Sequence, residues 1–159
     1  MVRKTVEERF SAKVHESDGG CHLWNAYIHP HGYGRFNDGT RMVFAHRWAY
    51  EHANGPIPDG LYVDHICHTR SCVNVEHLRL VTRKQNQENL GGVASDNTSG
   101  YRGVYQLKGS SSWRARVKHN GKYIDLGRFA RIEDANAAAV AMRNKLFTHN
   151  DLDRVAEPA

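Results

Sequence analysis

The chain has 159 residues, of which 40% are hydrophobic and 25% are charged. This length and composition fit one ordinary soluble domain or two small ones, exclude disorder throughout, and leave no apolar run long enough for a membrane span. The net charge of +5 favours an anionic partner, and three cysteines are too few for a disulfide framework. The first residues are polar, so we expect no secretory signal.

Charged and metal-binding residue types are divided unevenly along the chain. Residues 1–90 carry 11 Lys or Arg against 10 Asp or Glu, together with nine of the eleven histidines and all three cysteines. Residues 91–159 carry 11 Lys or Arg against 7 Asp or Glu. Between the two halves, residues 88–100 are small and polar without an aromatic side chain, which is typical of a linker. The sequence therefore predicts two modules.

Short elements are predicted in the N-terminal half. The residues before 60 predict a strand at 21–26, a hairpin of 32–36 and 41–44, and a helix at 45–51. A further strand at 61–65 enters a cysteine-containing loop, and residues 76–89 begin as a turn and become helical. Together the last elements predict a ββα unit around residues 61–89.

The loop after the 61–65 strand carries the most specific pattern in the sequence. It reads His65-x-Cys67-x4-Cys72-x4-His77, and Cys21 lies far upstream. Zinc prefers four soft or borderline ligands in a tetrahedron, and three cysteines with one histidine form a common closed set. A loop without a long apolar run needs such an ion to hold its shape. We therefore expect Cys21, Cys67, Cys72 and His77 to bind one structural zinc, the alternative being buried thiols beside a surface imidazole.

A second set of residues points to hydrolysis. Asp64 and His65 lie at the end of the 61–65 strand, and Asn86 falls on the predicted helix. A histidine can activate water, while Asp and Asn oxygens can hold a divalent ion that stabilises a pentacovalent phosphate. We call residues 65–77, which carry three of the four expected zinc ligands, the zinc loop. Together with the zinc loop, Asp64, His65 and Asn86 favour phosphodiester hydrolysis with Mg²⁺ or a similar divalent ion. The alternative is that they are polar surface residues without a function.

Residues from about 20 to 90 resemble the HNH, or His-Me finger (ββα-metal), nucleases, particularly the zinc-bound His-Cys box type of homing endonuclease. The similarity is carried by Val63-Asp64-His65-Ile66-Cys67-His68, Ser71-Cys72-Val73-Asn74, Glu76-His77-Leu78 and Val81-Thr82-x3-Asn86. The resemblance implies that His65 is the general base and that Asn86 binds the catalytic ion. The His-Cys box type has a second zinc cluster, but no cysteine follows Cys72 here, so one structural zinc per chain is expected.

The same resemblance implies roles for further residues. Asn74 matches the middle Asn of the HNH pattern, which shapes the loop and holds the base in orientation. Asp64 matches the ion-binding Asp of HNH homing nickases, although the His-Cys box enzymes do not require it. These enzymes also use an arginine on the preceding hairpin to stabilise the phosphate, for which Arg35 is the first choice and Arg41 the alternative.

The C-terminal half predicts a sheet and a helix. The strands are expected at 97–105, 113–118 and 122–127, and the helix at 132–147. Asn120-Gly121 is a strong type I′ hairpin signal between the second and third strands. Apolar and basic residues alternate in the second strand, so Arg114, Arg116 and Lys118 are expected on the face away from the helix. Such a face can contact phosphates and base edges, although most charged strand faces are only solvated.

Residues 97–147 resemble the APETALA2-type DNA-binding domain, found in plant transcription factors and many phage HNH homing endonucleases. The matching strings are Gly100-Tyr101-Arg102-Gly103-Val104, Trp113-Arg114-Ala115-Arg116, Leu126-Gly127-Arg128-Phe129 and Glu133-Asp134-Ala135. In that family the sheet reads the major groove of double-stranded DNA. The resemblance implies DNA contacts from Arg102, Tyr105, Arg114, Arg116, Lys118 and Tyr123. The first strand of the plant domains carries more arginine, so no base preference is transferred.

Together these patterns predict an α+β protein: a zinc-stabilised ββα-metal nuclease module over 1–90, a linker over 91–99, an APETALA2-like three-stranded antiparallel sheet packed on one helix over 100–150, and a flexible tail over 151–159. We expect a phage-encoded, homing-type endonuclease that acts on DNA in the cytoplasm of a bacterial host. The alternative is a sequence-specific DNA-binding regulator with a structural zinc module. A ββα-metal site has one active centre, so a double-strand break needs a homodimer or two sequential nicks.

Overall fold

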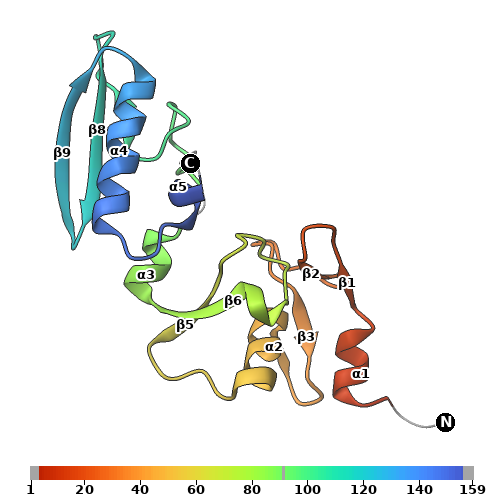
Figure 1. The fold of residues 1–159 in the computed structure, drawn as a ribbon. Coiled ribbons are helices and arrows are strands. Elements are labelled where there is room, and N and C mark those ends of the chain that lie inside the picture. The colour runs from red at the N-terminus through yellow and green to blue at the C-terminus, as the bar shows by residue number, and fades with distance from the viewer. Residues whose placement is uncertain (1–3, 91, 156–159) are drawn as a thin grey trace. The chain divides into compact units, whose positions relative to one another are not determined.

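The computed structural model describes residues 4–90 and 92–155, and the chain divides into two compact units, residues 1–86 and 87–159. Both units combine short antiparallel sheets with helices, which confirms the predicted α+β class (Figure 1). The boundary between the units falls within helix α3 (Arg83–Glu88).

The first unit places short hairpins around an aromatic core. Its described strands pair as β1 (Val14–Glu16) with β2 (His22–Trp24), β3 (Arg35–Asn37) with β4 (Met42–Phe44), and β5 (Leu61–His65) with β6 (Leu78–Thr82). The helical segments are α1 (Val6–Ser11), α2 (Ala45–Asn54), the 3-10 helix η1 (Val75–His77) and the start of α3. Phe10, Trp24 and Phe36 contact one another with ring centroids between 5.0 and 5.5 Å apart. This core fixes the β3–β4 hairpin against α1 and α2.

Strand β6 differs from the sequence prediction, which gives a turn that becomes a helix over residues 76–89. The structure places a strand between η1 and α3, and it pairs with β5 from Leu61↔Thr82 to His65↔Leu78. Leu78 and Val81 are buried, so the strand is held by burial as well as by its ladder to β5. The order β5, β6, α3 gives the predicted ββα unit with a shorter helix.

The second unit is a three-stranded antiparallel sheet with one long helix against it. The sheet order is β7 (Val104–Gln106), β8 (Trp113–His119) and β9 (Lys122–Phe129), and the helices are α4 (Ile132–Leu146) and α5 (Asp151–Val155). Ala115 and Val117 of β8 are buried against Ala135 and Ala139 of α4, whose small side chains permit a close approach. Asn120 has φ +49° in the β8–β9 turn, as the predicted Asn-Gly hairpin turn requires.

Strand β7 is shorter than the predicted 97–105 strand. Gly103 has φ +81°, and a Cβ at this residue would collide with the carbonyl oxygen of Arg116. The amide of Arg116 donates to the Gly103 carbonyl at 2.8 Å, so the backbone reaches the sheet through a turn before β7 begins at Val104.

Residues 151–155 of the predicted flexible tail form α5. Asp153 pairs with Arg143, whose Nη2 donates to Oδ1 at 3.0 Å and whose side chain is almost fully buried.

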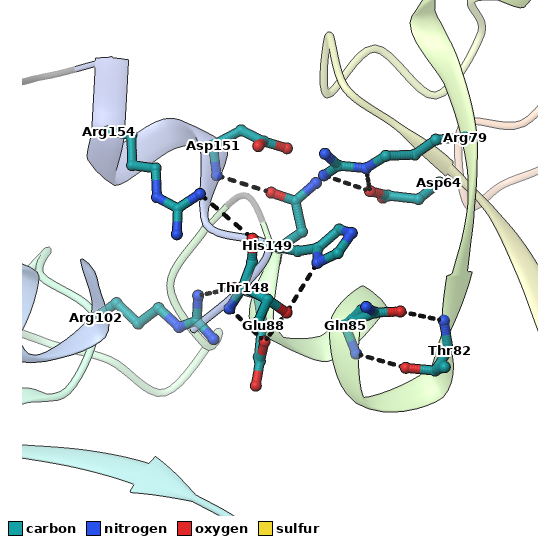
Figure 2. A network of polar contacts seen from close by, with 11 residues as sticks. Asp64, Arg79, Thr82, Gln85, Glu88, Arg102, Thr148, His149, Asp151 and Arg154 are labelled. Atoms are coloured by element: carbon teal, nitrogen blue, oxygen red, sulfur yellow. Dashed lines mark hydrogen bonds and ion pairs between the residues drawn. The ribbon is translucent and has the colours of Figure 1, made fainter. Parts of the chain in front are cut away.

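The boundary between the two units differs from the predicted one. The sequence assigns residues 87–90 to the nuclease module, whereas in the structure they belong to the second unit. Figure 2 shows Arg102 beside Glu88, and its guanidinium donates to the carbonyls of Gln87 and Glu88 within the second unit. Residues 91 and 156–159 lie outside the described residues.

Candidate metal centre and active site

The four predicted zinc ligands lie together in the first unit. The ligand atoms of Cys21, Cys67, Cys72 and His77 all lie within 4.8 Å of one another. Nδ1 of His77 is 3.5 Å from Sγ of Cys21 and 3.7 Å from Sγ of Cys72. Tetrahedral zinc with ordinary bond lengths gives sulfur–nitrogen separations of about 3.6 Å. The cluster therefore has the residue types and the spacing of a zinc site.

Backbone pairing brings the distant Cys21 to the loop. The amide of Trp24 donates to the Ser71 carbonyl at 2.9 Å, and the amide of Val73 donates to the His22 carbonyl at 2.7 Å. These bonds align the chain after Cys21 with the chain around Cys72. Sequence spacing alone does not predict this pairing.

Asn74 supports the same loop. Its Nδ2 donates to the Gly20 carbonyl at 2.8 Å, and its Oδ1 accepts from the amide of Glu76 at 3.1 Å. Its own amide lies 3.4 Å from Sγ of Cys72. These contacts agree with the predicted loop-shaping role of Asn74, whereas the bond that holds the ring of His65 comes from another residue.

The chemistry of the buried thiols fits a bound cation. Burial raises the pKa of Cys72 to about 12, and the hydrogen bond from the amide of Asn74 offsets only part of this effect. Zinc binds thiolates, so the thiolate of Cys72 is stable at neutral pH only beside a compensating cation. A proton is therefore released when the metal binds.

His65 is held at the end of β5 by the zinc loop. Its side chain is buried, and Nε2 lies 3.0 Å from the carbonyl oxygen of Cys72. A carbonyl oxygen only accepts hydrogen bonds, so in the neutral ring Nε2 carries the proton and Nδ1 keeps its lone pair. Burial lowers the pKa of His65, the hydrogen bond to Cys72 and the carboxylate of Asp64 offset part of this effect, and Arg70 and His68 add a smaller lowering. The ring is therefore neutral near pH 7 and can accept a proton at Nδ1.

A second buried histidine lies beside His65. The ring centroid of His46, on the first turn of α2, is 4.9 Å from that of His65 and 5.1 Å from that of Tyr33. Burial lowers the pKa of His46 to about 3, with further lowering by His65 and Arg47. From the sequence, His46 is expected to make only a packing or phosphate contact. Its proximity to His65 could not be predicted, because it arises from tertiary packing between α2 and β5.

We expect His46 to make the protein less stable in acid. The folded pKa of about 3 lies below the ordinary value of 6.5, so below pH 6.5 the unfolded chain binds a proton that the folded chain excludes. His46 therefore does not lower the free energy of unfolding above pH 6.5. Between pH 6.5 and pH 3 it lowers this free energy by up to about 1.4 kcal/mol per pH unit.

The replacement His46→Phe removes this titration and keeps an aromatic ring beside Tyr33. Urea unfolding at pH 7 and pH 5 should then show a smaller loss of stability in the variant than in the wild type. The metal cluster is the same in both proteins, so the difference in pH slope reports on His46 and on its interaction with His65. Equal pH slopes would contradict the assignment.

The two predicted ligands of a catalytic ion, Asp64 and Asn86, differ in their burial and in their contacts. Asp64 is buried, and its Oδ2 accepts from Nε and Nη2 of Arg79 at 3.1 and 3.0 Å across the β5–β6 pair (Figure 2). Asn86 is half-buried on α3. An ion on Asp64 would share this carboxylate with the guanidinium of Arg79. Sequence reasoning missed Arg79 because it did not predict β6.

The two candidate phosphate-binding arginines lie on the β3–β4 hairpin. The guanidinium of Arg35 lies 4.7 Å from the ring centroid of Phe44, and its Nη2 donates to the Met42 carbonyl at 3.3 Å. Arg41 lies in the connecting turn, where its amide donates to Asp38 at 2.9 Å. Arg35 is thus held along the hairpin next to Phe44.

The predicted DNA-contacting residues of the second unit fall into two groups. Arg116 lies over Tyr105 and Tyr123, with Cζ 4.9 and 4.3 Å from the ring centroids, and Nζ of Lys118 lies 5.6 Å from the Tyr123 centroid. These four side chains border a hollow of about 350 Å³. We call them the cation–tyrosine face.

The remaining two arginines of the predicted set are engaged within the second unit. Arg102 donates to the backbone around Glu88 and is half-buried. Arg114 is ion-paired with Asp125, and this contact lowers the pKa of Asp125 to about 2. A pattern of alternating charges does not reveal which cations already have an internal partner.

Among residues 4–90 and 92–155, no helix is both long and apolar enough to cross a membrane.

In comparisons with known proteins, the HNH endonuclease family matches residues 43–88. This match includes α2, β5, the zinc loop, β6 and α3. No solved structure gives a significant match to the chain.

Phage proteins are similar to part of the chain. Protein 7.7 of Escherichia phage T7 is 40% identical over 70 residues, which are 44% of this chain and 54% of that protein. The uncharacterized gene 5.3 protein of Enterobacteria phage T3 is 35% identical over 79 residues, 45% of this chain and 78% of that protein. Protein 3.8 of Escherichia phage T7 is 40% identical over 77 residues, 48% of this chain and 63% of that protein. The chain thus spans about half the length of protein 7.7 and more of the other two.

Proposed function

We propose that this chain, which belongs to the HNH endonuclease family through its residues 43–88, is a phage-encoded, homing-type endonuclease that hydrolyses phosphodiester bonds in double-stranded DNA in its bacterial host. The observation that carries the proposal is the hydrogen bond between Nε2 of His65 and the Cys72 carbonyl. This bond directs the proton of a neutral, buried imidazole away from Nδ1, which is the state a general base requires.

In the proposed reaction, Nδ1 of His65 takes a proton from water as the water oxygen attacks phosphorus. The bond from phosphorus to the leaving 3′ oxygen breaks on the opposite side, and the 3′ oxygen later takes up a proton from solvent. A divalent ion such as Mg²⁺, held by Asp64 and Asn86, would stabilise the charge on the phosphate and on the leaving oxygen. Arg79 keeps the carboxylate of Asp64 oriented at the end of the β5–β6 pair.

The proposed zinc has a positioning role. Cys72 would bind zinc through Sγ while its carbonyl accepts the hydrogen bond from His65. One residue therefore links the metal centre to the general base. Fixing this carbonyl limits the rotation of the imidazole ring, as partners outside the reacting set do in other catalytic sites.

Incubation of supercoiled plasmid with the purified protein and Mg²⁺ tests the proposed function. A nuclease converts the plasmid to open-circular or linear DNA, and EDTA stops the conversion. Open-circular product alone indicates nicking by one active centre, whereas direct formation of linear product indicates paired chains. A protein that binds the plasmid but leaves it supercoiled with each divalent ion tried would instead be a DNA-binding regulator.

We propose that the second unit is the APETALA2-like DNA-binding domain and that it contacts DNA through the cation–tyrosine face. Stacking on two tyrosines restricts the Arg116 side chain before DNA arrives, so less conformational entropy is lost on binding. A planar guanidinium in this setting can form two hydrogen bonds to a phosphate or to a guanine edge. Lys118 adds a positive charge on the same strand.

Replacing Arg116 or Lys118 with alanine should weaken DNA binding and leave the plasmid-cutting chemistry intact at saturating protein. Each lost phosphate contact should reduce the slope of log affinity against log salt by about one. Arg131→Ala is the matched control, because Arg131 is an exposed cation of the same unit that pairs with Glu133. Equal effects of all three variants, measured by fluorescence anisotropy at several salt concentrations, would indicate that the cation–tyrosine face is not the DNA-binding surface.

A further inference from the structure

Arg70 is held in a defined position in the loop between Cys67 and Cys72. Its Nη1 donates to the His31 carbonyl at 3.0 Å, and its guanidinium carbon lies 5.6 Å from the ring centroid of Tyr33. The side-chain stem passes close to Gly32, where a Cβ would lie 3.4 Å from Cδ of Arg70. The contacts with His31 and Tyr33 restrict the orientation of Arg70 more than that of a fully solvated arginine, although the residue is exposed.

The position of Arg70 is set by the same loop that forms the metal centre. The amide of Cys72 donates to the Thr69 carbonyl at 2.9 Å, and Oγ1 of Thr69 donates to the Cys67 carbonyl at 3.3 Å. The loop is therefore a tight turn between two proposed zinc ligands, and Arg70 lies on it. Its backbone cannot shift far without displacing Cys72.

Arg70 also lies near the proposed general base. The guanidinium of Arg70 lies over the ring of Tyr33. The centroid of this ring is 6.0 Å from that of His65. A cation beside Tyr33 attracts an anion to the neighbourhood of the His65 ring.

The hairpin arginine is separated from His65 by more rings. Arg35 lies over Phe44, the Phe44 centroid is 5.8 Å from that of His46, and His46 is the neighbour of His65. Arg70 and His65 share one ring neighbour, Tyr33. Arg70 is thus linked to the proposed base through one ring, and Arg35 through two.

We propose that Arg70 contacts a non-bridging oxygen of the scissile phosphate, in place of the role that the family resemblance gives to Arg35. This inference rests on the proposed nuclease function. In the transition state the negative charge on the non-bridging oxygens increases, and a fixed guanidinium stabilises it more than it stabilises the bound substrate. The zinc loop then supplies three parts of one site: the metal ligands, the carbonyl that orients His65 and the cation for the phosphate.

Single-turnover cleavage of plasmid DNA by the full chain tests this assignment with Arg70→Ala, Arg70→Lys, the competing candidate Arg35→Ala, and the matched control Arg47→Ala, which removes an exposed arginine of α2. We expect Arg70→Ala to lower the rate constant about 10²-fold or more, as the loss of one transition-state donor does elsewhere. Arg70→Lys should recover part of the rate because it keeps the charge without the planar fork. Arg35→Ala should lower the rate constant less than Arg70→Ala does, and Arg47→Ala should stay within about threefold of wild type, well below the effect of a lost transition-state donor.

Two further measurements separate a phosphate contact from a structural role. Zinc content should equal that of wild type, and guanidinium ion added to Arg70→Ala should restore part of the rate constant. A rate for Arg70→Ala near wild type, a loss of zinc in this variant, or no recovery with guanidinium would overturn the assignment of Arg70. A wild-type protein that cuts no DNA would instead refute the proposed function itself, so the two failures are distinguishable.

Discussion

Replacing His65 with alanine is expected to slow DNA cleavage about 10²-fold or more while zinc content and DNA affinity remain near those of wild type. In the proposed mechanism the imidazole contributes a proton acceptor at Nδ1, whereas the proposed zinc ligands and the cation–tyrosine face lie on other residues. The alanine variant loses the chemical step because water is a weak nucleophile without a base. Single-turnover rates at saturating protein measure this step apart from binding.

The His65→Ala variant also removes the hydrogen bond to the Cys72 carbonyl, so a structural effect must be separated from a catalytic one. Imidazole added to the solution should restore part of the rate in the alanine variant if a proton acceptor is what was lost. His52→Ala is a matched control, because His52 is an exposed histidine of α2 that stacks on Trp48 at 4.8 Å. Loss of zinc from His65→Ala would identify His65 as a structural residue and contradict its assignment as the base.

The pH dependence of the cleavage rate should also report on His65 as the general base. A general base acts in its neutral form, so the rate falls as pH falls through the pKa of His65. Burial holds this pKa below the ordinary value for histidine, and activity should therefore persist below pH 6.5. The direction of this shift follows from the position of His65 between β5 and the zinc loop.

Residue types and spacing predicted the part of the site that lies on one short stretch of chain. The ligands Cys67, Cys72 and His77 are separated by five residues or fewer along a loop, and the structure brings them together with Cys21 as the sequence predicts. Ligand chemistry is specific enough that every cysteine of the chain found a place in the cluster. The partner strand that brings Cys21 there was not predictable, because its hydrogen bonds join residues 71–73 to 22–24.

Contacts made by tertiary packing were missed for a common physical reason. His46, Arg70 and Arg79 carry no motif, and their relation to His65 or Asp64 depends on how α2, the zinc loop and β6 fold against β5. In the second unit the alternating pattern correctly placed Arg116 and Lys118 on exposed positions. The same pattern could not show that Arg102 and Arg114 bind partners inside the unit.

The proposed zinc and the proposed general base are linked through the backbone of Cys72. The carbonyl that orients His65 and the thiol that faces His77 belong to the same residue, and Arg70 lies two positions before it. Displacement of the loop therefore moves the base and the proposed phosphate contact together. Chelation is expected to reduce activity even when the catalytic ion is resupplied.

Replacing Cys72 with alanine should release about one zinc per chain and destabilise the first unit by several kcal/mol, because binding and folding are coupled in loops held by a metal. Cys72 is fully buried and its Sγ lies 3.7 Å from Nδ1 of His77, so the alanine variant lacks one of the four ligand atoms of the cluster. Thermal unfolding with and without added zinc, together with metal analysis of the purified protein, measures both effects. Cleavage should fall in the same variant, because the carbonyl of residue 72 no longer has a fixed position.

Ser71→Ala is the matched control for Cys72→Ala, since it changes a neighbouring side chain of the same loop without removing a ligand. It should keep its zinc and unfold near the wild-type temperature. The pH at which wild-type protein loses zinc provides an independent measurement, because protons compete with the metal for the thiolates and for His77. Wild-type protein that contains no zinc and unfolds at the same temperature with or without a chelator would refute the metal centre, and with it the reason that the loop holds His65 and Arg70 in place.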